Sequence, residues 1–464
     1  MRFAERTGGR VPKVASTVEK DQIQALQRTL YRAAKAGPER RFHALYDKVH
    51  RRDVLERAWE LVRRNRGAAG IDQVTVAEVE QYGASRLLDE LAVGLKAGSY
   101  RPGPSRRVLI PKPGSSERRG LSIPTVADRI VQSALKLVIE PVFEADFLPC
   151  SFGFRPKRTT HDALQVLVDE AWRGSGRRWV LETDIASCFD AIPHQQLMLA
   201  VQERVVDRHV LKLIRGMLRA GVMQSDGTVR HSVTGTPQGG VISPLLANVY
   251  LHRVDRAWKA ADGVLVRYAD DLVVMCRSEG EAERALVVLR SLLADLGLQL
   301  KAAKTRIVHL REGAGGLDFL GFQHRWVRGE SPKHRHVMFL ARWPSRKAMQ
   351  HARDRIREIT GRRRLLLPVA QIVQELNQFL RGWAGYFRYG NSTRQLAMIR
   401  LYAVDRLARF IAKRHKRSWR YGWKAVVHLS PNYMGLVSLH GIVVAPRPNR
   451  PWREKPNAAG ERRR

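Results

Sequence analysis

The sequence predicts an α+β protein in which a small split β-α-β-β-α-β sheet precedes a basic helical bundle. A strand-like run at residues 179–185 contains Asp184 near its end. Several helical patterns separate it from a strand-turn-strand run at 264–276, which carries Asp270 and Asp271 at its turn. Residues 341–420 contain 20 Lys and Arg against 4 Asp and Glu, with apolar residues at helical spacing.

The charge balance narrows the class of partner. The 464 residues include 82 Lys and Arg and 44 Asp and Glu, so the formal net charge is +38. A folded chain this basic indicates a polyanionic partner, nucleic acid first and a membrane surface second. Neither end offers an amphipathic helix with a bulky apolar face. No apolar run reaches the ~18 residues of a membrane span.

Other sequence signals exclude several function classes. The start of the chain has no apolar region typical of a secretion signal. The three cysteines are far apart, so they support neither a disulfide framework nor a Cys-type zinc site, and a reducing compartment is expected. The chain lacks a GxxxxGK[ST] phosphate loop and an HExxH motif, which argues against nucleotide-driven motors and zinc peptidases.

The N-terminal region reads as basic helices. We expect a mobile leader at 1–20 and helices at 21–35, 52–66 and, as a pair, 76–98. Their outer faces are rich in Lys and Arg. Solvated charge is the ordinary explanation for such faces, but the excess over acidic residues favours contact with a phosphate backbone.

A β-hairpin is predicted next, with strands at 106–112 and 119–124 around a loop at 113–116. Lys112 and Arg119 stand on opposed strands and could hold an anionic group such as a triphosphate, although a solvated charge pair is the plainer alternative. A helix at 128–144 follows, then a glycine-punctuated loop at 152–156 that carries Arg155. Another helix opens near Thr160, where His161 is expected to be a capping or core residue.

The two acidic segments are separated by helices. Helices are predicted at 193–201, 208–220 and 243–258, with a glycine-rich turn at 234–240 that contains Gln238. After the acidic hairpin come a helix at 279–296 and a strand at 305–310. In a split sheet the strand of Asp184 can lie beside the hairpin, which would bring Asp184, Asp270 and Asp271 together.

Clustered carboxylates suit divalent cations. Adjacent like charges near buried strands repel and lose solvation, and a hard metal ion would offset this; a solvated acidic turn is the alternative. Two Mg²⁺ ions ~4 Å apart can support an in-line displacement at phosphorus. Asp184 and Asp270 are the expected ligands, Asp271 a weaker third, and the Ile185 carbonyl could add an oxygen.

Two more residues are candidates for nucleotide contact. Phe189 lies five residues after Asp184, and a ring beside the sugar would exclude a 2′-OH and so favour deoxynucleotides; alternatively, Phe189 is simply a core residue. Gln238 could reach a sugar or phosphate from its glycine-flanked turn, or it could be an ordinary surface turn residue.

These residues match a known family. Tyr268-Ala269-Asp270-Asp271 resembles the active-site box of reverse transcriptases, and Thr183-Asp184-Ile185 resembles the strand with the first metal-binding Asp. Residues 235–244 resemble the nucleotide-pocket box. The hairpin and 151–156 resemble the fingers boxes, 320–322 the box that grips the primer end, and 377–387 the maturase domain. Over about 26–424, the chain resembles a bacterial group II intron-encoded reverse transcriptase/maturase.

The resemblance implies a right-hand polymerase architecture. The expected parts are a basic N-terminal extension (1–85), fingers (86–180), a palm (181–330), a helical thumb/maturase bundle (331–425) and a short extension (426–464) with a disordered tail. The implied activity is RNA-directed DNA synthesis, with binding of the intron RNA to assist splicing and mobility by target-primed reverse transcription. Implied cofactors are two Mg²⁺ ions, and implied partners are intron RNA, an RNA template with DNA primer or target, and dNTPs. The implied location is the bacterial cytoplasm, in association with the nucleoid.

The resemblance also assigns residues. Lys112, Arg119, Phe189 and Gln238 would line the dNTP site. Template, primer or intron RNA would contact Arg155, Lys304 and Gly321, together with cations of a three-helix bundle at 345–360, 369–387 and 393–415, namely Arg362, Arg363, Arg364, Lys413 and Arg414. A generic basic bundle is the alternative. Ala186 and Ala303 depart from the commoner Lys and Glu, but neither is a proposed metal ligand.

The C-terminal part leaves alternatives open. A strand-like segment at 437–444 precedes a Pro- and Arg-rich tail, and nothing matches the Cys-paired His-Asn-His nuclease of many relatives. The chain therefore resembles the endonuclease-lacking class, which must find its primer on a nicked, single-stranded or replicating target. The competing interpretations are a splicing-only RNA-binding maturase and a reverse transcriptase repurposed for a host or defence role.

Overall fold

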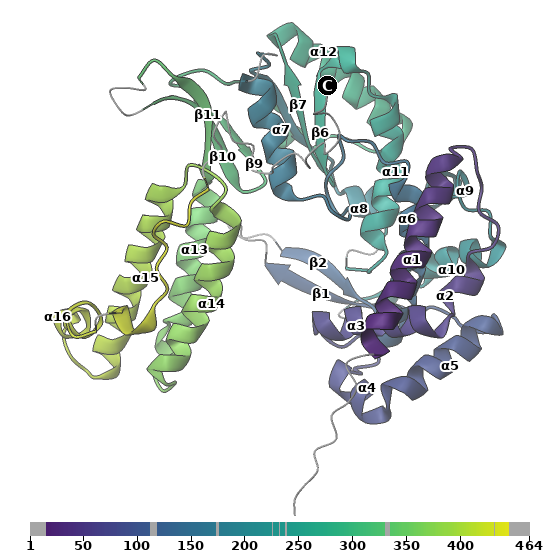
Figure 1. The fold of residues 1–464 in the computed structure, drawn as a ribbon, viewed down its shortest axis with the longest axis horizontal. Coiled ribbons are helices and arrows are strands. Elements are labelled where there is room, and N and C mark those ends of the chain that lie inside the picture. The colour runs from purple at the N-terminus through teal and green to yellow at the C-terminus, as the bar shows by residue number, and fades with distance from the viewer. Residues whose placement is uncertain are drawn as a thin grey trace, which may run out of the picture.

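The computed structural model describes residues 15–111, 118–172, 176–224, 226–231, 233–236, 239–329, 335–430 and 432–444. Figure 1 shows the N-terminal helices gathered on one side, a central sheet with its covering helices, and a separate helical lobe formed by the C-terminal part of the chain. Lys112 and Gln238 lie outside the described residues.

The central sheet has the predicted split order. Its strands run β6-β7-β3-β8, and every neighbouring pair is antiparallel. The helices between β3 and β6, and the helix between β7 and β8, complete the β-α-β-β-α-β pattern. The strands are β3 (Trp179–Asp184), β6 (Val264–Tyr268), β7 (Asp271–Cys276) and β8 (Arg306–His309).

Each face of this sheet belongs to a different hydrophobic core. Leu181 and Val274 point into a core shared with N-terminal helices, α11 (Ser243–Ala257) and α12 (Glu279–Asp295). Val180 and Val273 point into a core shared with α7 (Thr160–Trp172) and the C-terminal helices. Because strand residues alternate between faces and both faces are covered, these strands are apolar on both sides.

The N-terminal helices pack around α6 (Val126–Glu144), which is buried along most of its length. The helices predicted at 52–66 and 76–98 are confirmed as α3 (Arg52–Asn65), α4 (Val76–Tyr82) and α5 (Ala84–Lys96). The helix predicted at 21–35 is confirmed as α1 (Ala15–Ala36), which begins six residues earlier, within the segment expected to be a mobile leader. The short helix α2 (Tyr46–Val49) was not predicted. Beyond β3 lie α8 (Cys188–Ala191), α9 (His194–Gln202) and α10 (Arg208–Arg219).

A second sheet, here called the N-terminal sheet, contains two unpredicted strands. The predicted hairpin forms β1 (Ser105–Pro111) and β2 (Arg118–Ile123). The sheet order is β2-β1-β4-β5, with β4 (Val222–Met223) parallel to β1 and β5 (Val229–Arg230) antiparallel to β4. Residues from the range that sequence analysis assigned to the palm therefore extend the sheet of the range assigned to the fingers.

The C-terminal bundle is the three-helix unit α13 (Arg346–Ile359), α14 (Val369–Phe387) and α15 (Thr393–Arg414), which matches the predicted helices closely. A three-stranded sheet of order β11-β10-β9 connects it to the central sheet, with β9 (Leu317–Phe319), β10 (Phe322–Arg328) and β11 (Met338–Pro344). The short helix α16 (Trp419–Trp423) and a π-helical turn at Lys424–His428 follow.

The predicted strand at 437–444 is wrong. This segment is a loop whose backbone groups bond to the bundle instead of to another strand. The Val437 N–H donates to Asn377 Oδ1 (2.7 Å), the Val444 N–H donates to the Arg388 carbonyl (2.7 Å), and Leu439 is buried against the bundle. Among the described helices, none is long and apolar enough to cross a bilayer.

Asp207 joins the N-terminal helices to α10. Its carboxylate accepts the N–H groups of Leu45 and Tyr46 (2.8 Å each), and it caps α10 through the N–H groups of His209 and Val210. Burial acts to raise the pKa of this carboxyl, but the four backbone donors outweigh burial and hold the pKa below its usual range.

We therefore expect Asp207→Ala to lower the free energy of unfolding by about 2–3 kcal/mol at pH 7, because it leaves buried donors unpaired. A depressed native pKa stabilises the fold above the unfolded pKa of about 3.9 and loses that effect as pH falls. The difference should shrink below about pH 4 in urea titrations. Asp226→Ala, at an exposed turn, is the control and should change stability far less; equal losses from both variants would contradict the assignment.

Candidate active site

The three predicted carboxylates are brought together at one end of the central sheet. Asp184, the last residue of β3, pairs in register with Asp271, the first residue of β7. The Ile185 N–H donates to the Asp270 carbonyl (3.1 Å), which fixes the turn of the β6-β7 hairpin beside the end of β3. The predicted juxtaposition is therefore confirmed.

The cluster is electrostatically strained. Burial and the neighbouring Asp184 and Asp270 carboxylates raise the pKa of Asp271 to about 7. Burial and the Asp184 carboxylate also raise the pKa of Asp270. Asp184 Oδ1 is buried with no hydrogen-bond partner among the described residues. Such a set is stabilised by added positive charge.

Lys304 supplies positive charge in this structure. Its ammonium is ion-paired with Asp184 Oδ2 and lies 3.9 Å from Asp271 Oδ1. Burial lowers the pKa of Lys304, but the hydrogen bond to Asp184 and the negative charges of Asp184, Asp271 and Asp270 together outweigh burial and leave the pKa above its usual value. Lys304 was predicted to contact nucleic acid, whereas here its partner is the carboxylate cluster.

The donor set fits a hard divalent cation. Among the described residues, no group of three or more Asp, Glu, His or Cys side chains is arranged so that it could by itself hold a metal ion. An unpartnered carboxylate oxygen beside two further carboxylates is nevertheless the oxygen-rich, partly open arrangement that Mg²⁺ takes together with substrate phosphates. Asp184, Asp270 and Asp271, with the Ile185 carbonyl, are the groups that could hold it.

A fully buried arginine bonds to the turn of the acidic hairpin and to the elements packed against it. Arg267 lies in β6 and its side chain has no exposed surface. It donates two hydrogen bonds to Asp255 of α11 (2.7 and 2.5 Å) and one each to Asn248 Oδ1 (3.0 Å), Ser151 Oγ (2.8 Å) and the Ala269 carbonyl (3.2 Å). Ala269 has φ +58°, so a non-glycine residue holds the left-handed turn position.

The loop after α6 packs directly against the same hairpin. The Phe152 N–H donates to the Arg267 carbonyl, and the Arg267 N–H donates to the Cys150 carbonyl (2.8 Å each). A Cβ on Gly153 would collide with the backbone of Ala269. The Gly153 carbonyl accepts Asn248 Nδ2 (2.8 Å), so loop, helix and hairpin are locked together.

Arg155 has a structural role in the described fold, which corrects the predicted contact with nucleic acid. Its side chain is 4% exposed and forms an ion pair with Glu144 (2.7 Å). It also donates to the carbonyls of Leu148 (2.6 Å) and Ser151 (2.8 Å). A buried guanidinium whose donors are bound to protein acceptors has no donor to offer a phosphate.

The glycine-rich turn lies between α8 and β2. The Thr236 N–H donates to the Phe189 carbonyl (2.7 Å), and a Cβ on Gly239 would collide with the Ser122 carbonyl. Phe189 is half-buried, and its ring meets the Phe154 ring edge to face at 6.4 Å between centroids. The backbone of Phe189 is therefore held by Thr236, whereas Gln238 lies outside the described residues.

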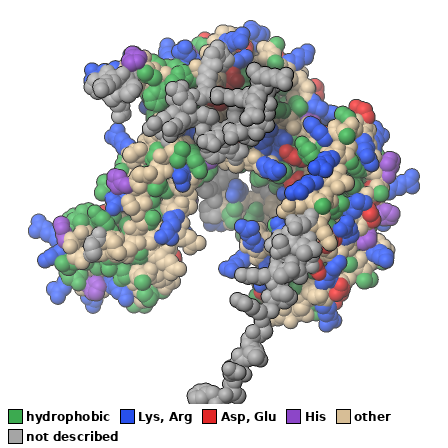
Figure 2. Space-filling view, viewed as in Figure 1, with side chains coloured by type: hydrophobic (Ala, Val, Ile, Leu, Met, Phe, Trp, Pro, Cys, Tyr) green, Lys and Arg blue, Asp and Glu red, His purple; other side chains and the backbone are tan. Residues whose placement is uncertain are grey.

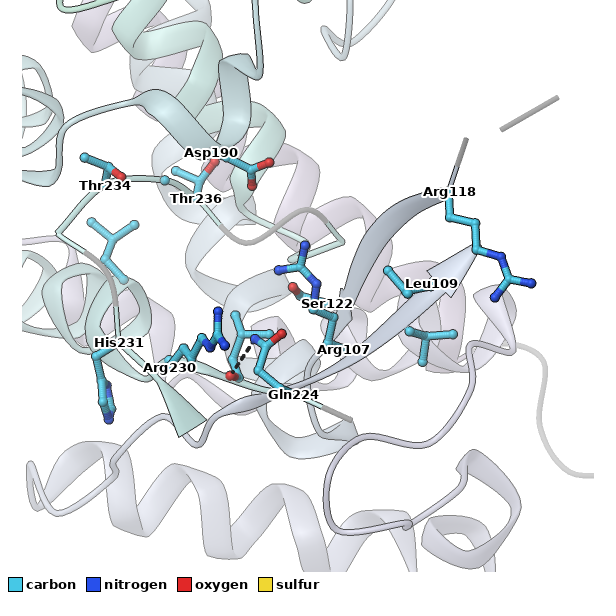
Figure 3. A pocket seen from close by; sticks show the side chains of 15 residues that line it. Arg107, Leu109, Arg118, Ser122, Asp190, Gln224, Arg230, His231, Thr234 and Thr236 are labelled. Atoms are coloured by element: carbon cyan, nitrogen blue, oxygen red, sulfur yellow. Dashed lines mark hydrogen bonds between the residues drawn. The ribbon is translucent and has the colours of Figure 1, made fainter. Parts of the chain in front are cut away.

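A cavity of 930 Å³ opens between this turn and the N-terminal sheet. Figure 3 shows Arg107, Arg118 and Arg230 on the sheet side and Asp190, Thr234 and Thr236 on the other. Arg118 lines this cavity. The predicted residue Arg119 lies one position further along β2, where it is exposed and pairs with Ile110. Three guanidinium groups make this cavity suited to an anionic ligand.

A second cavity, of 610 Å³, extends from Asp271 to the C-terminal bundle. Asp271 and Lys304 line one end, and Gly321, Lys347 and His351 line the other. Gly321 has φ +79° in the turn between β9 and β10, and its carbonyl accepts the Ser345 N–H (2.9 Å). The predicted primer-end turn and Asp271 thus line one cavity.

The five predicted cations of the bundle divide into two groups. Arg362, Arg363 and Lys413 are exposed. Arg364 forms an ion pair with Glu375 (2.6 Å), and Arg414 donates to the carbonyls of Leu365 (2.7 Å) and Leu367. The second group holds the connection between α13 and α14 in place.

The sequence alone did not predict the supporting roles of Arg267, Asp255 and Asn248. One signal could have found them: Arg267 interrupts an apolar run that otherwise predicts a buried strand, and a buried guanidinium requires a carboxylate partner. It also missed β4 and β5, although Asp226-Gly227 is the residue pair that hairpin turns favour.

Comparison with known families identifies both halves of this arrangement. The family described as reverse transcriptase (RNA-dependent DNA polymerase) matches residues 110–324. The maturase-specific domain of group II introns matches residues 349–426. The first match spans the central sheet with its carboxylates, and the second spans the C-terminal bundle.

Individual relatives agree with these matches. Protein YkfC of Escherichia coli is 33% identical over 353 residues, which cover 67% of this chain and 89% of YkfC. The group II intron-encoded protein LtrA of Lactococcus lactis is 36% identical over 217 residues, 46% of this chain and 35% of LtrA. An uncharacterized 91 kDa protein in the cob intron of Schizosaccharomyces pombe is 37% identical over 169 residues, 36% of this chain and 20% of that protein. The chain therefore belongs to the family of group II intron-encoded reverse transcriptases with a maturase domain.

Proposed function

We propose that this protein copies RNA into DNA and binds its intron RNA to assist splicing and mobility by target-primed reverse transcription. The observation that carries this proposal is the position of the carboxylate cluster. Its member Asp271 lines the cavity shared with Gly321, and β3, which ends at Asp184, leads directly into α8 with Phe189. A primer end and an incoming nucleotide could thus approach Asp184, Asp270 and Asp271 together.

The parts of the chain would divide the work as in a right-hand polymerase. Residues 86–180 would form fingers, 181–330 a palm and 331–425 a thumb that also serves as the maturase domain, with 1–85 and 426–464 as extensions. The β4-β5 hairpin would then be a palm insertion that completes the fingers sheet. Partners would be intron RNA, template RNA with DNA primer or target, and dNTPs, in the bacterial cytoplasm near the nucleoid.

Bound Mg²⁺, two ions in this proposal, would neutralise charge on the attacking and leaving oxygens. Asp184 and Asp270 would hold it, with Asp271 and the Ile185 carbonyl in support. Lys304 would give up its bond to Asp184 and carry its charge toward the substrate phosphates. Arg119 would contact the triphosphate and Phe189 the sugar; Lys112 and Gln238 retain their predicted roles outside the described residues.

Asp270→Ala should abolish extension of a DNA primer on an RNA template with dNTPs and Mg²⁺, because it removes a proposed metal ligand. Asp262→Ala, in the short turn before β6, is the matched control and should retain activity. Full synthesis by Asp270→Ala would show that the metal assignment is wrong, whereas no synthesis by the unaltered protein would reject the polymerase proposal itself.

Phe189→Ala should admit ribonucleotides, because it removes the ring proposed to block a 2′-OH. The measurement is the ratio of kcat/KM for dNTP and rNTP in single-nucleotide extension, which should fall by about tenfold or more, equivalent to ~1.4 kcal/mol. Phe154→Ala removes the neighbouring ring and is the control. An unchanged ratio in Phe189→Ala would leave Phe189 as a core residue only.

Gly153→Ala should lower kcat without changing the metal ligands. The added methyl group would push the Ala269 backbone and displace the Asp270 turn, and a displacement near 1 Å can reduce the rate about 100-fold. The readout is single-turnover extension at saturating dNTP. Gly382→Ala, in α14 with open space around it, should behave as wild type. Wild-type kcat in Gly153→Ala would show that the hairpin does not depend on this contact.

A further inference from the structure

Two exposed aromatic side chains lie on the short helix α16, which packs against α15 of the C-terminal bundle. Trp419 and Tyr421, both in α16, are 44% and 45% exposed. Figure 2 shows hydrophobic and basic side chains mixed on the lobe that α16 occupies in Figure 1. Two large exposed rings on one short helix need an explanation, since such rings are enriched where macromolecules bind.

Specific contacts hold the rings in place. Trp419 Nε1 donates to Asp405 Oδ1 (3.0 Å), and the Trp419 ring leans on Trp423 at 5.2 Å between centroids. The centroid of the Tyr421 ring lies 5.8 Å from the centroid of the His415 ring. Gly422 sits so close to the Ala408 carbonyl of α15 that a Cβ would collide with it, so α16 is pressed tightly onto α15.

Cations surround the rings without acidic neighbours in sequence. Residues 409–424 contain seven Lys and Arg and no Asp or Glu. Arg409 pairs with Asp405 (2.8 Å), the same carboxylate that orients Trp419. Within the described part of the chain, no ion pair involves the exposed cations at the rest of this surface, which are Lys413, Lys416, Arg417, Arg420 and Lys424.

We propose that Trp419 and Tyr421, with Lys416, Arg417 and Arg420 around them, form a stacking surface for unpaired RNA bases. Oriented rings among unpaired cations are the combination by which proteins hold single-stranded nucleic acid: the rings stack on bases while the cations contact phosphates. Base-paired RNA cannot offer its base faces, so loops, bulges and ends are selected. This inference rests on the proposed intron RNA partner and names the RNA feature that the bundle recognises.

The test compares a hairpin RNA that has an unpaired loop with a fully paired RNA duplex of equal length, both binding the full-length protein. The double variant Trp419→Ala/Tyr421→Ala should weaken hairpin binding by about tenfold or more, because stacking on one ring contributes ~1–3 kcal/mol. Duplex binding should be unchanged, and the salt dependence of hairpin binding should keep its slope. Arg417→Gln/Arg420→Gln should instead reduce that slope by roughly one for each phosphate that the variant no longer neutralises.

Controls separate stacking from loss of fold. Trp419→Phe should keep most of the hairpin affinity, and Tyr82→Ala, which removes a ring 48% exposed in α4, should leave it unchanged. A hairpin loop that contains 5-iodouridine should photocrosslink to Trp419 or Tyr421. Crosslinks only at other residues, equal loss of hairpin and duplex binding, or unchanged hairpin affinity in the double variant would overturn the proposal.

Two outcomes distinguish this inference from neighbouring explanations. If the double variant changes the sedimentation of the RNA-free protein, the surface is a self-association site and the proposal fails. Primer extension on a preformed RNA–DNA duplex should be unaffected by the double variant. If the unaltered protein extends the primer but the double variant binds the hairpin normally, the stacking surface is rejected while the polymerase proposal stands.

Discussion

The ion pair between Arg267 and Asp255 is the interaction on which the site depends. Both side chains are fully buried, so both charges lose their solvation. The free energy lost by desolvation can exceed the free energy gained from the attraction between the two charges. Removing one partner of such a pair typically costs about 3–5 kcal/mol, because it leaves an uncompensated buried charge. The pair contributes mainly by fixing geometry. The Arg267 guanidinium also donates to Ser151, Asn248 and the Ala269 carbonyl. One side chain therefore holds the loop after α6, helix α11 and the turn of the acidic hairpin together.

That fixation matters because the turn is unfavourable in isolation. Ala269 adopts a left-handed conformation that costs a non-glycine residue roughly 1–2 kcal/mol. Burial, together with repulsion from the Asp184 and Asp270 carboxylates, raises the pKa of Asp271 to about 7. A turn held only by its own two strands could relax by moving the acidic residues apart. Because Gly153 and Arg267 contact the Ala269 backbone and hold the turn, the carboxylates stay close together and continue to repel one another. A bound cation would reduce that repulsion.

Periodicity explains what the sequence could predict. Apolar runs and helical stripes located the central sheet and the bundle. The strand order followed because the split β-α-β-β-α-β motif places the strand that ends at Asp184 beside the hairpin that carries Asp270. Strands β4 and β5 have two residues each, which is too short to show the alternation of apolar and polar residues that predicts a strand. The segment 437–444 has strand composition but lies against the helical bundle, where its N–H groups bond to Asn377 and to the Arg388 carbonyl. Local pattern cannot report which neighbour a segment will meet.

The same limit applies to charge. A sequence shows that Arg155, Arg364 and Arg414 are cations, but only the fold shows that their donors are occupied by Glu144, Glu375 and backbone carbonyls. A cation that a carboxylate already neutralises, as Glu144 does Arg155 and Glu375 does Arg364, contributes less to counterion release on binding nucleic acid. Arg414 bonds only to neutral carbonyls and is exposed, so its charge remains available. The formal charge of +38 therefore overstates the electrostatic contribution to RNA affinity. The cations that can contribute are the exposed ones, such as Arg362, Arg363 and those beside Trp419. Their arrangement around oriented rings, more than the total charge, is what could distinguish one RNA from another.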